Sequence, residues 1–265
     1  MTGSKQIDVF LKAVSWRDLV PLTRAEVVAE LLLSVPWRLL SLVFAYLHWY
    51  PLALLASFTF FLAGLRQTHN AFHYALGISS KACDLVMFSL SVLMLGSMHA
   101  VQLNHLAHHT HCLSEDDVEG SSARTTGWRA ILIGPLFPLR LHRAALKRAR
   151  GPSRLWIWNE LLANLLVLVA VFGVMRVSWL EYHYIAMAIG QCLTSFFAVW
   201  TVHHDCRVNP HQARTLRGRL KNALTFNMFF HVEHHLFPGV PTCHLPQLAE
   251  RLDRVAPELR EVQVF

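Results

Sequence analysis

Four long apolar runs, arranged in two pairs, are the feature that most constrains the fold of this chain of 265 residues. The first pair covers roughly residues 29–49 and 52–65, separated by Pro51, and the second pair covers roughly residues 156–175 and 184–201. Each run approaches the about 20 residues that an α-helix needs to cross a bilayer core. Only 15% of the residues are charged, whereas soluble domains carry about 25%. We therefore predict an all-α integral membrane fold with two transmembrane helical hairpins, or about four spanning helices.

A fifth apolar segment, residues 85–95, lies between Asp84 and Gly96. Its length of about 11 residues is too short for a comfortable span, which favours an interfacial or re-entrant helix. The distinction affects the chemistry, because a true span would place the histidines before it and after it on opposite sides of the membrane.

Basic residues indicate the orientation of the hairpins. The chain carries 24 Lys and Arg against 17 Asp and Glu, and the cations are concentrated in residues 124–154 and 207–260, whereas the connection between the third and fourth runs holds only Arg176. By the positive-inside rule, we expect both termini and every histidine cluster to face the cytoplasm. The net charge of +7 is therefore assigned to topology, and nucleic-acid binding is not expected. Residues 124–154 also have the composition of a basic segment lying on lipid headgroups.

No internal repeat or linker divides the chain, so residues 1–265 are interpreted as a single membrane-embedded domain with interfacial helices and a cytoplasmic histidine-rich cap. The first twenty residues have no continuous apolar run after their basic residues and do not resemble a cleaved signal peptide.

Histidines form three clusters and one pair among the 17 in the chain. The first cluster is His69 and His73; the second is His105, His108 and His109; the third is His231, His234 and His235; the pair is His203 and His204. On a helix, positions i, i+3 and i+4 share one face, so each cluster directs its imidazoles to one point. Eight rings, or nine with one member of the pair, exceed the needs of one ion and fit two transition metals with about four or five nitrogens each.

Other catalytic and metal motifs fit poorly. No HExxH zinc motif, ExxH di-iron motif, nucleotide-binding glycine loop or GxSxG nucleophile motif occurs,. The five cysteines form no CxxC pair, so neither a disulfide framework nor a cysteine zinc site is expected,. A membrane metal transporter remains an alternative, but it would be expected to place polar ligands through the bilayer, and the apolar runs are almost free of ionisable residues,.

Two of these segments resemble a known family. Residues 226–241, which read FNMFFHVEHHLFPGVP, are similar to the final histidine box of bacterial membrane fatty acid desaturases. The second cluster, followed by Glu115, Asp116 and Asp117, resembles the second box of that family. The resemblance covers roughly residues 52–252 and extends to the related membrane hydroxylases and carotenoid ketolases.

The resemblance implies a centre of two iron ions (Fe2+/Fe3+) that uses O2 as co-substrate. Its implied ligands are His69, His73, His105, His108, His109, His231, His234 and His235. The family's additional histidine would be His204, with His203 as the alternative. Asn227 is a candidate water-mediated ligand, and Asp116, Asp117 and Glu233 are candidate acceptors for ring N–H groups.

The leading interpretation is therefore an O2-dependent desaturase that removes hydrogens from an unactivated fatty acyl chain. A hydroxylase or ketolase acting on a similar apolar substrate is the close alternative. The substrate, which could be linked to a carrier or a lipid, would enter from the bilayer. Electrons are expected from an external donor such as a ferredoxin or cytochrome, since the sequence has no haem-attachment or nucleotide-binding motif,.

Overall fold

The computed structural model describes residues 12–206, 212–261 and 263–264. The extreme N-terminus and C-terminus and residues 207–211 lie outside this part, so the expected position of the two chain ends concerns residues that are not described.

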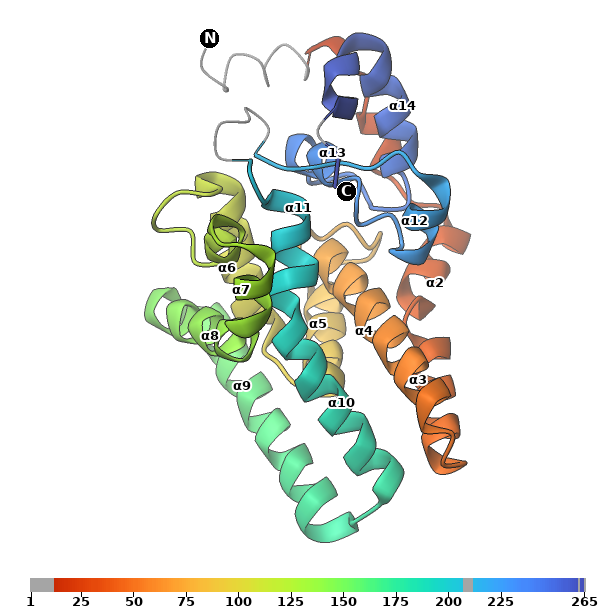
Figure 1. Ribbon diagram of the computed structural model, residues 1–265, viewed down its shortest axis with the longest axis vertical. Coiled ribbons are helices and arrows are strands. Elements are labelled where there is room, and N and C mark those ends of the chain that lie inside the picture. The colour runs from red at the N-terminus through yellow and green to blue at the C-terminus, as the bar shows by residue number, and fades with distance from the viewer. Residues whose placement is uncertain (1–11, 207–211, 262, 265) are drawn as a thin grey trace.

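The described residues form an all-α fold (Figure 1). The helices are α2 (Arg24–Leu32), α3 (Val35–Tyr46), α4 (Tyr50–Phe72), α5 (Ser80–Met94), α6 (Met98–His111), α7 (Gly127–Leu132), α8 (Phe137–Arg148), α9 (Gly151–Leu168), α10 (Ser178–Thr194), α11 (Thr201–His203), α12 (Arg219–Leu224), α13 (His231–Leu236) and α14 (Leu245–Val255). Two π-helical segments extend the long helices, η4 (Val169–Met175) after α9 and η5 (Ser195–Trp200) between α10 and α11. Short 3-10 turns are η1 (Arg17–Leu19), η2 (Gly120–Arg124), η3 (Gly134–Leu136) and η6 (Pro257–Glu261).

Three helical stretches are long and apolar enough to cross a membrane, namely 24–46, 151–175 and 178–203, and a bent pair of helices would make a fourth. The prediction of an all-α membrane fold is confirmed. Helix α3 packs against α4 as the first expected hairpin, and Figure 1 shows α9 and α10 joined by a turn at one end as the second. Helix α4 is not among the three stretches, because its last turns carry polar residues from Arg66 onward.

Helices α5 and α6 form the bent pair, with an angle of 113° between them. The break contains Leu95, whose φ of 56° is left-handed. A buried carboxylate on α9 fixes the bend: Glu160 accepts hydrogen bonds from the Ser97 hydroxyl at 2.5 Å and lies 2.6 Å from Nδ1 of His99. The Asn164 amide donates to the Gly96 carbonyl from the same helix at 3.2 Å. The chain therefore bends sharply between α5 and α6, as in a broken span or a re-entrant loop, and the re-entrant interpretation of residues 85–95 stays a prediction.

The C-terminal helices lie at the end of the molecule that carries the histidines (Figure 1). The apolar face of α14, including Leu245, Leu248 and Leu252, is buried in a cluster with Val232 of α13 and Leu19 near the N-terminus. We call this C-terminal part, with helices α13 and α14, the cap. Polar contacts join the cap to α4 next to the first histidine cluster.

Candidate metal centre

Helix α4 presents the first cluster, and a buried polar network fixes its last turns. Arg66 forms a two-bonded ion pair with Glu30 of α2, and the Asn70 amide donates to the same carboxylate at 2.9 Å. The Asn70 carbonyl oxygen accepts from the backbone N–H and the hydroxyl of Thr242. Arg66 and Asn70 flank His69 by three residues and one residue, so this network sets the position of the first cluster relative to the cap.

The second and third clusters lie on α6 and α13, and His203 ends the last long helix at α11. Their ring nitrogens converge although the clusters are far apart in sequence. The Nε2 atoms of His73 and His105 lie 3.1 Å apart, and those of His109 and His234 lie 2.9 Å apart. All the clusters therefore meet at one end of the helical bundle, and none is separated from the others by the re-entrant segment.

The converging atoms form two groups, each within 4.8 Å. Site A contains His69, His73, His105 and His234, and site B contains His108, Cys112, His203 and His235. His109 adjoins site A, since its Nε2 is 3.1 Å from that of His105. His231 adjoins site B, since its Nε2 is 2.9 Å from that of His203.

Ring orientation explains why these groups suit cations. The Nδ1 atom of His203 lies 2.7 Å from the Gln212 carbonyl oxygen, which can only accept, so this nitrogen carries the hydrogen,. The Nδ1 atom of His108 lies 2.7 Å from the Asp117 carboxylate, and that of His105 lies 2.8 Å from Glu119. In the neutral form with the hydrogen on Nδ1, each ring directs its Nε2 lone pair at the Nε2 atoms of other rings,. This repulsive arrangement becomes favourable when metal ions accept the lone pairs.

Two further ring nitrogens support the fit to metals. Nε2 of His69 and Nε2 of His235 are buried without a hydrogen-bond partner in the described part of the chain. Burial, reinforced by neighbouring rings, holds the pKa of His231, His234 and His235 well below the ordinary histidine value,. Neutral, unpartnered imidazoles are the form that binds transition metals.

The carboxylates behind the rings differ in charge. Burial opposes ionisation of Asp117, but the hydrogen bond and charge of His108, together with the backbone N–H groups of Gly120 and Leu113, outweigh it and leave the pKa of Asp117 below its usual value. Burial raises the pKa of Glu119 to about 7. Asp117 was among the predicted acceptors, whereas Glu119 was not. Glu119 could have been found from the sequence, because it ends the acidic run of residues 115–119 that follows the second cluster.

The structure does not bring the other candidate residues into the ligand groups. His204 stacks on Trp200 with ring centroids 4.1 Å apart, and its Nδ1 lies 2.9 Å from the Trp200 carbonyl. It is His203 whose ring faces the cluster. Glu233 is fully buried, where it accepts from the Thr215 hydroxyl and pairs with Arg217.

Two candidates remain: Asp116 belongs to neither ligand group, and Asn227 stays a predicted water-mediated ligand. Asp116 is exposed, and its backbone carbonyl accepts from Arg148. Asn227 precedes α13 in a left-handed conformation with φ 64°, so it does not share a helical face with His231.

Histidines that were not expected to be ligands have other roles where they are described. His99 binds Glu160, and His142 accepts from the Ser97 backbone N–H at 2.8 Å. Nε2 of His183 donates to the Leu93 carbonyl. His244 contacts Glu26 and the Leu19 carbonyl. His211 lies outside the described residues.

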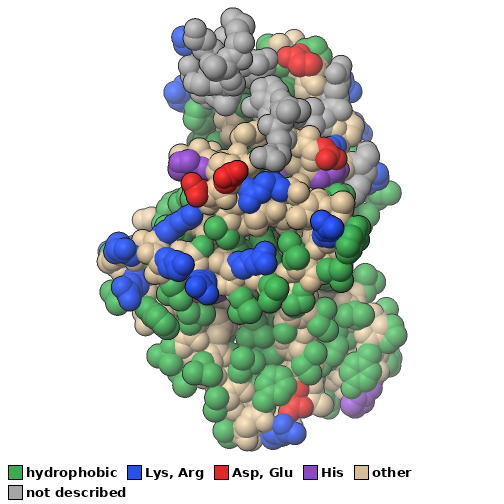
Figure 2. Space-filling view, turned by 60° about the vertical axis from the view of Figure 1, so that its left-hand side comes forward, with side chains coloured by type: hydrophobic (Ala, Val, Ile, Leu, Met, Phe, Trp, Pro, Cys, Tyr) green, Lys and Arg blue, Asp and Glu red, His purple; other side chains and the backbone are tan. Residues whose placement is uncertain are grey.

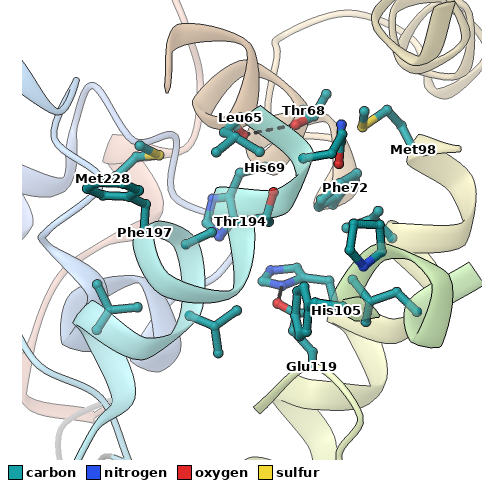
Figure 3. Close-up of a pocket in the computed structure, with 18 of the residues that line it drawn as sticks. Leu65, Thr68, His69, Phe72, Met98, His105, Glu119, Thr194, Phe197 and Met228 are labelled. Carbon is teal, nitrogen blue, oxygen red and sulfur yellow. Dashed lines mark hydrogen bonds and ion pairs between the residues drawn. The ribbon is translucent and has the colours of Figure 1, made fainter. Parts of the chain in front are cut away.

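An apolar cavity reaches the histidines from the helical bundle (Figure 3). His69, His105 and His231 line part of its wall, together with Glu119. The rest of its wall is mainly apolar, and it is formed by Leu65, Phe72, Met98, Val101, Phe137, Leu141, Phe197, Ala198, Val199, Val202, Met228 and Phe229. The cavity therefore borders site A through His69 and His105, and it borders His231 beside site B.

Comparison with known proteins reveals relatives at low identity. The chain is 26% identical over 206 residues to the sphingolipid delta(4)-desaturase/C4-monooxygenase DES2 of Homo sapiens, which covers 72% of this chain and 59% of that protein. It is 30% identical over 97 residues to DES2 of Rattus norvegicus, covering 37% of this chain and 29% of that protein. It is 24% identical over 198 residues to a beta-carotene ketolase of Paracoccus sp., covering 70% and 73%. The chain thus spans less than two thirds of the length of each of these DES2 relatives.

The sequence model of the fatty acid desaturase family matches residues 47–264. This range includes all three histidine clusters, both ligand groups and the apolar cavity. With this match over most of its length, the chain belongs to the fatty acid desaturase family.

Proposed function

We propose that this protein is an O2-dependent membrane oxidoreductase that introduces a double bond into a fatty acyl chain. The observation that carries the proposal is the convergence of nine imidazoles into two groups beside an apolar cavity, which three of these rings line. The family supports an oxidoreductase acting on lipids, and the cavity supports a hydrocarbon substrate.

Two irons are the metals that this proposal requires. Site A would use His69, His73, His105, His109 and His234, and site B would use His108, His203, His231 and His235. Bound iron changes oxidation state and would supply the means to activate O2 against an unactivated C–H bond.

The side chains of the cavity wall position the substrate and keep water away from it. Phe72, Phe137 and Phe197 line the cavity and exclude water from a bound hydrocarbon. The cavity fixes which carbon atoms approach His69 and His105. A shift of about 1 Å in a bound substrate can change the outcome of a reaction, so this wall selects between removal of two adjacent hydrogens and addition of oxygen.

Oxygenation is the second candidate, favoured by the names of the relatives. DES2 is named as both a desaturase and a C4-monooxygenase, and the Paracoccus protein is a ketolase. The same ligand groups would serve a hydroxylase or ketolase of an apolar lipid or natural product.

Removal of two hydrogens with reduction of O2 to two waters consumes two additional electrons and two protons. We propose that an external ferredoxin or cytochrome donates the electrons. A band of basic side chains borders the apolar surface (Figure 2), and Arg140, Arg143 and Lys147 are exposed on α8. This band would attract an acidic donor and the phosphate of a carrier- or lipid-linked substrate. The positive-inside rule places it, with the histidines, at the cytoplasmic side.

Mass spectrometry of lipids tests the reaction. Cells that express the wild type should accumulate an acyl product lighter by two hydrogens, and His108→Ala should abolish it. His48→Ala is the matched control, because His48 is exposed and contacts Tyr50 far from both ligand groups. A product that gains oxygen instead would establish the second candidate. No new product, from a protein that is inserted and carries its metals, would overturn both.

A further inference from the structure

We propose that Cys112 is a further metal ligand, binding through its thiolate at site B. This inference rests on the proposed di-iron centre and adds sulfur to a ligand set that the sequence presents as histidine alone.

Helical spacing places Cys112 on the face of the second cluster. It lies seven residues after His105 and four after His108 at the end of α6, and positions i, i+3, i+4 and i+7 share a helical face. The Sγ atom lies 3.6 Å from Nε2 of His108. It is also within 4.8 Å of the ligand atoms of His203 and His235.

The thiol has little other use at this position. The Cys112 side chain is buried, with 8% of the residue exposed. Its one backbone acceptor, the Gln212 carbonyl oxygen, is 3.8 Å from Sγ. Beside it, Nε2 of His235 is buried without a partner among the described residues. A metal ion would use both atoms.

The two sites are unequal without the sulfur. Among the described residues, five imidazoles surround site A, whereas four surround site B. A Cys112 thiolate gives site B a fifth ligand and a negative charge, and soft thiolates bind iron well. Formation of the S–metal bond releases the thiol proton to solvent, so the step involves no change of oxidation state.

The other cysteines provide the contrast. Cys206 is also buried, with 1% exposed, but its thiol donates to the His204 carbonyl at 3.4 Å. Neither Cys206 nor Cys83, Cys192 and Cys243 belongs to a ligand group in the described part of the chain. Cys206→Ser is therefore a matched control for Cys112→Ser.

X-ray absorption at the iron edge of the purified full-length protein is the decisive measurement. The wild type should show a sulfur scatterer at about 2.3 Å, the usual metal–thiolate distance. Cys112→Ser and Cys112→Ala should lose this scatterer, and Cys206→Ser should keep it. Loss of a ligand should also weaken retention of one iron against a chelator by about 10- to 100-fold.

The outcomes separate this inference from the proposed function. Two irons bound by nitrogen and oxygen alone in the wild type would overturn the Cys112 ligand and leave the di-iron proposal intact. A sulfur scatterer that persists in Cys112→Ser would also overturn it. A folded wild-type protein that binds no iron would overturn the proposed centre together with its sulfur ligand.

Discussion

The Nε2 atoms of His108 and His203 lie 3.2 Å apart, although 95 residues separate them in the chain. The Asp117 carboxylate orients the His108 ring, and the Gln212 carbonyl orients the His203 ring. When both rings are neutral with the hydrogen on Nδ1, their two Nε2 lone pairs face each other,. Site B is therefore built from two distant segments whose mutual repulsion a bound cation would remove.

From this relationship we propose His203 as the additional ligand, and its replacement should disable one site. We predict that His203→Ala lowers the iron content from about two to about one per chain, since a site with few remaining nitrogens holds its metal weakly. Elemental analysis of purified protein measures the change, and turnover should be lost with it.

His204→Ala is the control for this prediction. The His204 ring stacks on Trp200 outside both groups, so iron content and activity should remain near the wild-type values. The opposite pattern, with iron lost from His204→Ala and kept in His203→Ala, would reverse the assignment.

Asp117 should act on the metal through His108. The Asp117→Asn variant keeps the shape of the side chain but removes the charge that orients the ring and increases its basicity. We predict a fall in iron affinity of about 10- to 100-fold, a typical cost of losing such a partner. Competition with a chelator measures the affinity. Asp116→Asn is the matched control, because Asp116 is exposed, and equal losses in the two variants would contradict the role of Asp117.

Much of the centre could be predicted from spacing. Histidines at i, i+3 and i+4 must share a face of a helix, and residues 105–109 and 231–235 do so on α6 and α13. The apolar runs predicted the hairpins because bilayer thickness fixes helix length. The ends of the helices could not be predicted as well, because the helices begin before the apolar runs, at Arg24 and Gly151.

Contacts that depend on tertiary structure could not be read from spacing. The π-helical segment η5 precedes His203 and changes the rotation of the residues after it, so helical spacing alone does not tell which member of the pair faces site B,. Glu160 sits within an apolar run, and its partners Ser97 and His99 are about 60 residues away. Cys112 was not predicted as a ligand, because cysteine metal sites are recognised in sequences by paired cysteines.

Glu160 should stabilise the re-entrant bend. Replacement by Leu leaves the Ser97 hydroxyl and His99 without their buried acceptor, and we predict a loss of about 2–4 kcal/mol in the free energy of unfolding. A lower thermal midpoint in detergent measures this loss. Iron content should fall too, because α6 carries the second cluster. Glu181→Leu is the control, since Glu181 pairs with the exposed Arg176; equal midpoints for both variants would contradict the anchoring role.

Membrane orientation can be measured with topology reporters. A reporter inserted after Gly120 should read cytoplasmic, because the basic segment 124–154 follows it and the positive-inside rule retains such segments. A reporter after Arg176, between the long helices 151–175 and 178–203, should read from the opposite side. A Gly120 reporter on the non-cytoplasmic side would refute the orientation.

Filling the cavity should separate substrate binding from metal binding. Ala198 lines the cavity but belongs to neither ligand group. In Ala198→Phe, the added ring occupies space that the acyl chain needs, and overpacking at such a site costs about 1–3 kcal/mol. We predict at least a tenfold loss of turnover, or a shift to shorter acyl products, with both irons retained. Leu162→Phe is the control, because Leu162 is 54% exposed on α9. If Ala198→Phe processes the same lipids at the wild-type rate, the substrate does not occupy this cavity.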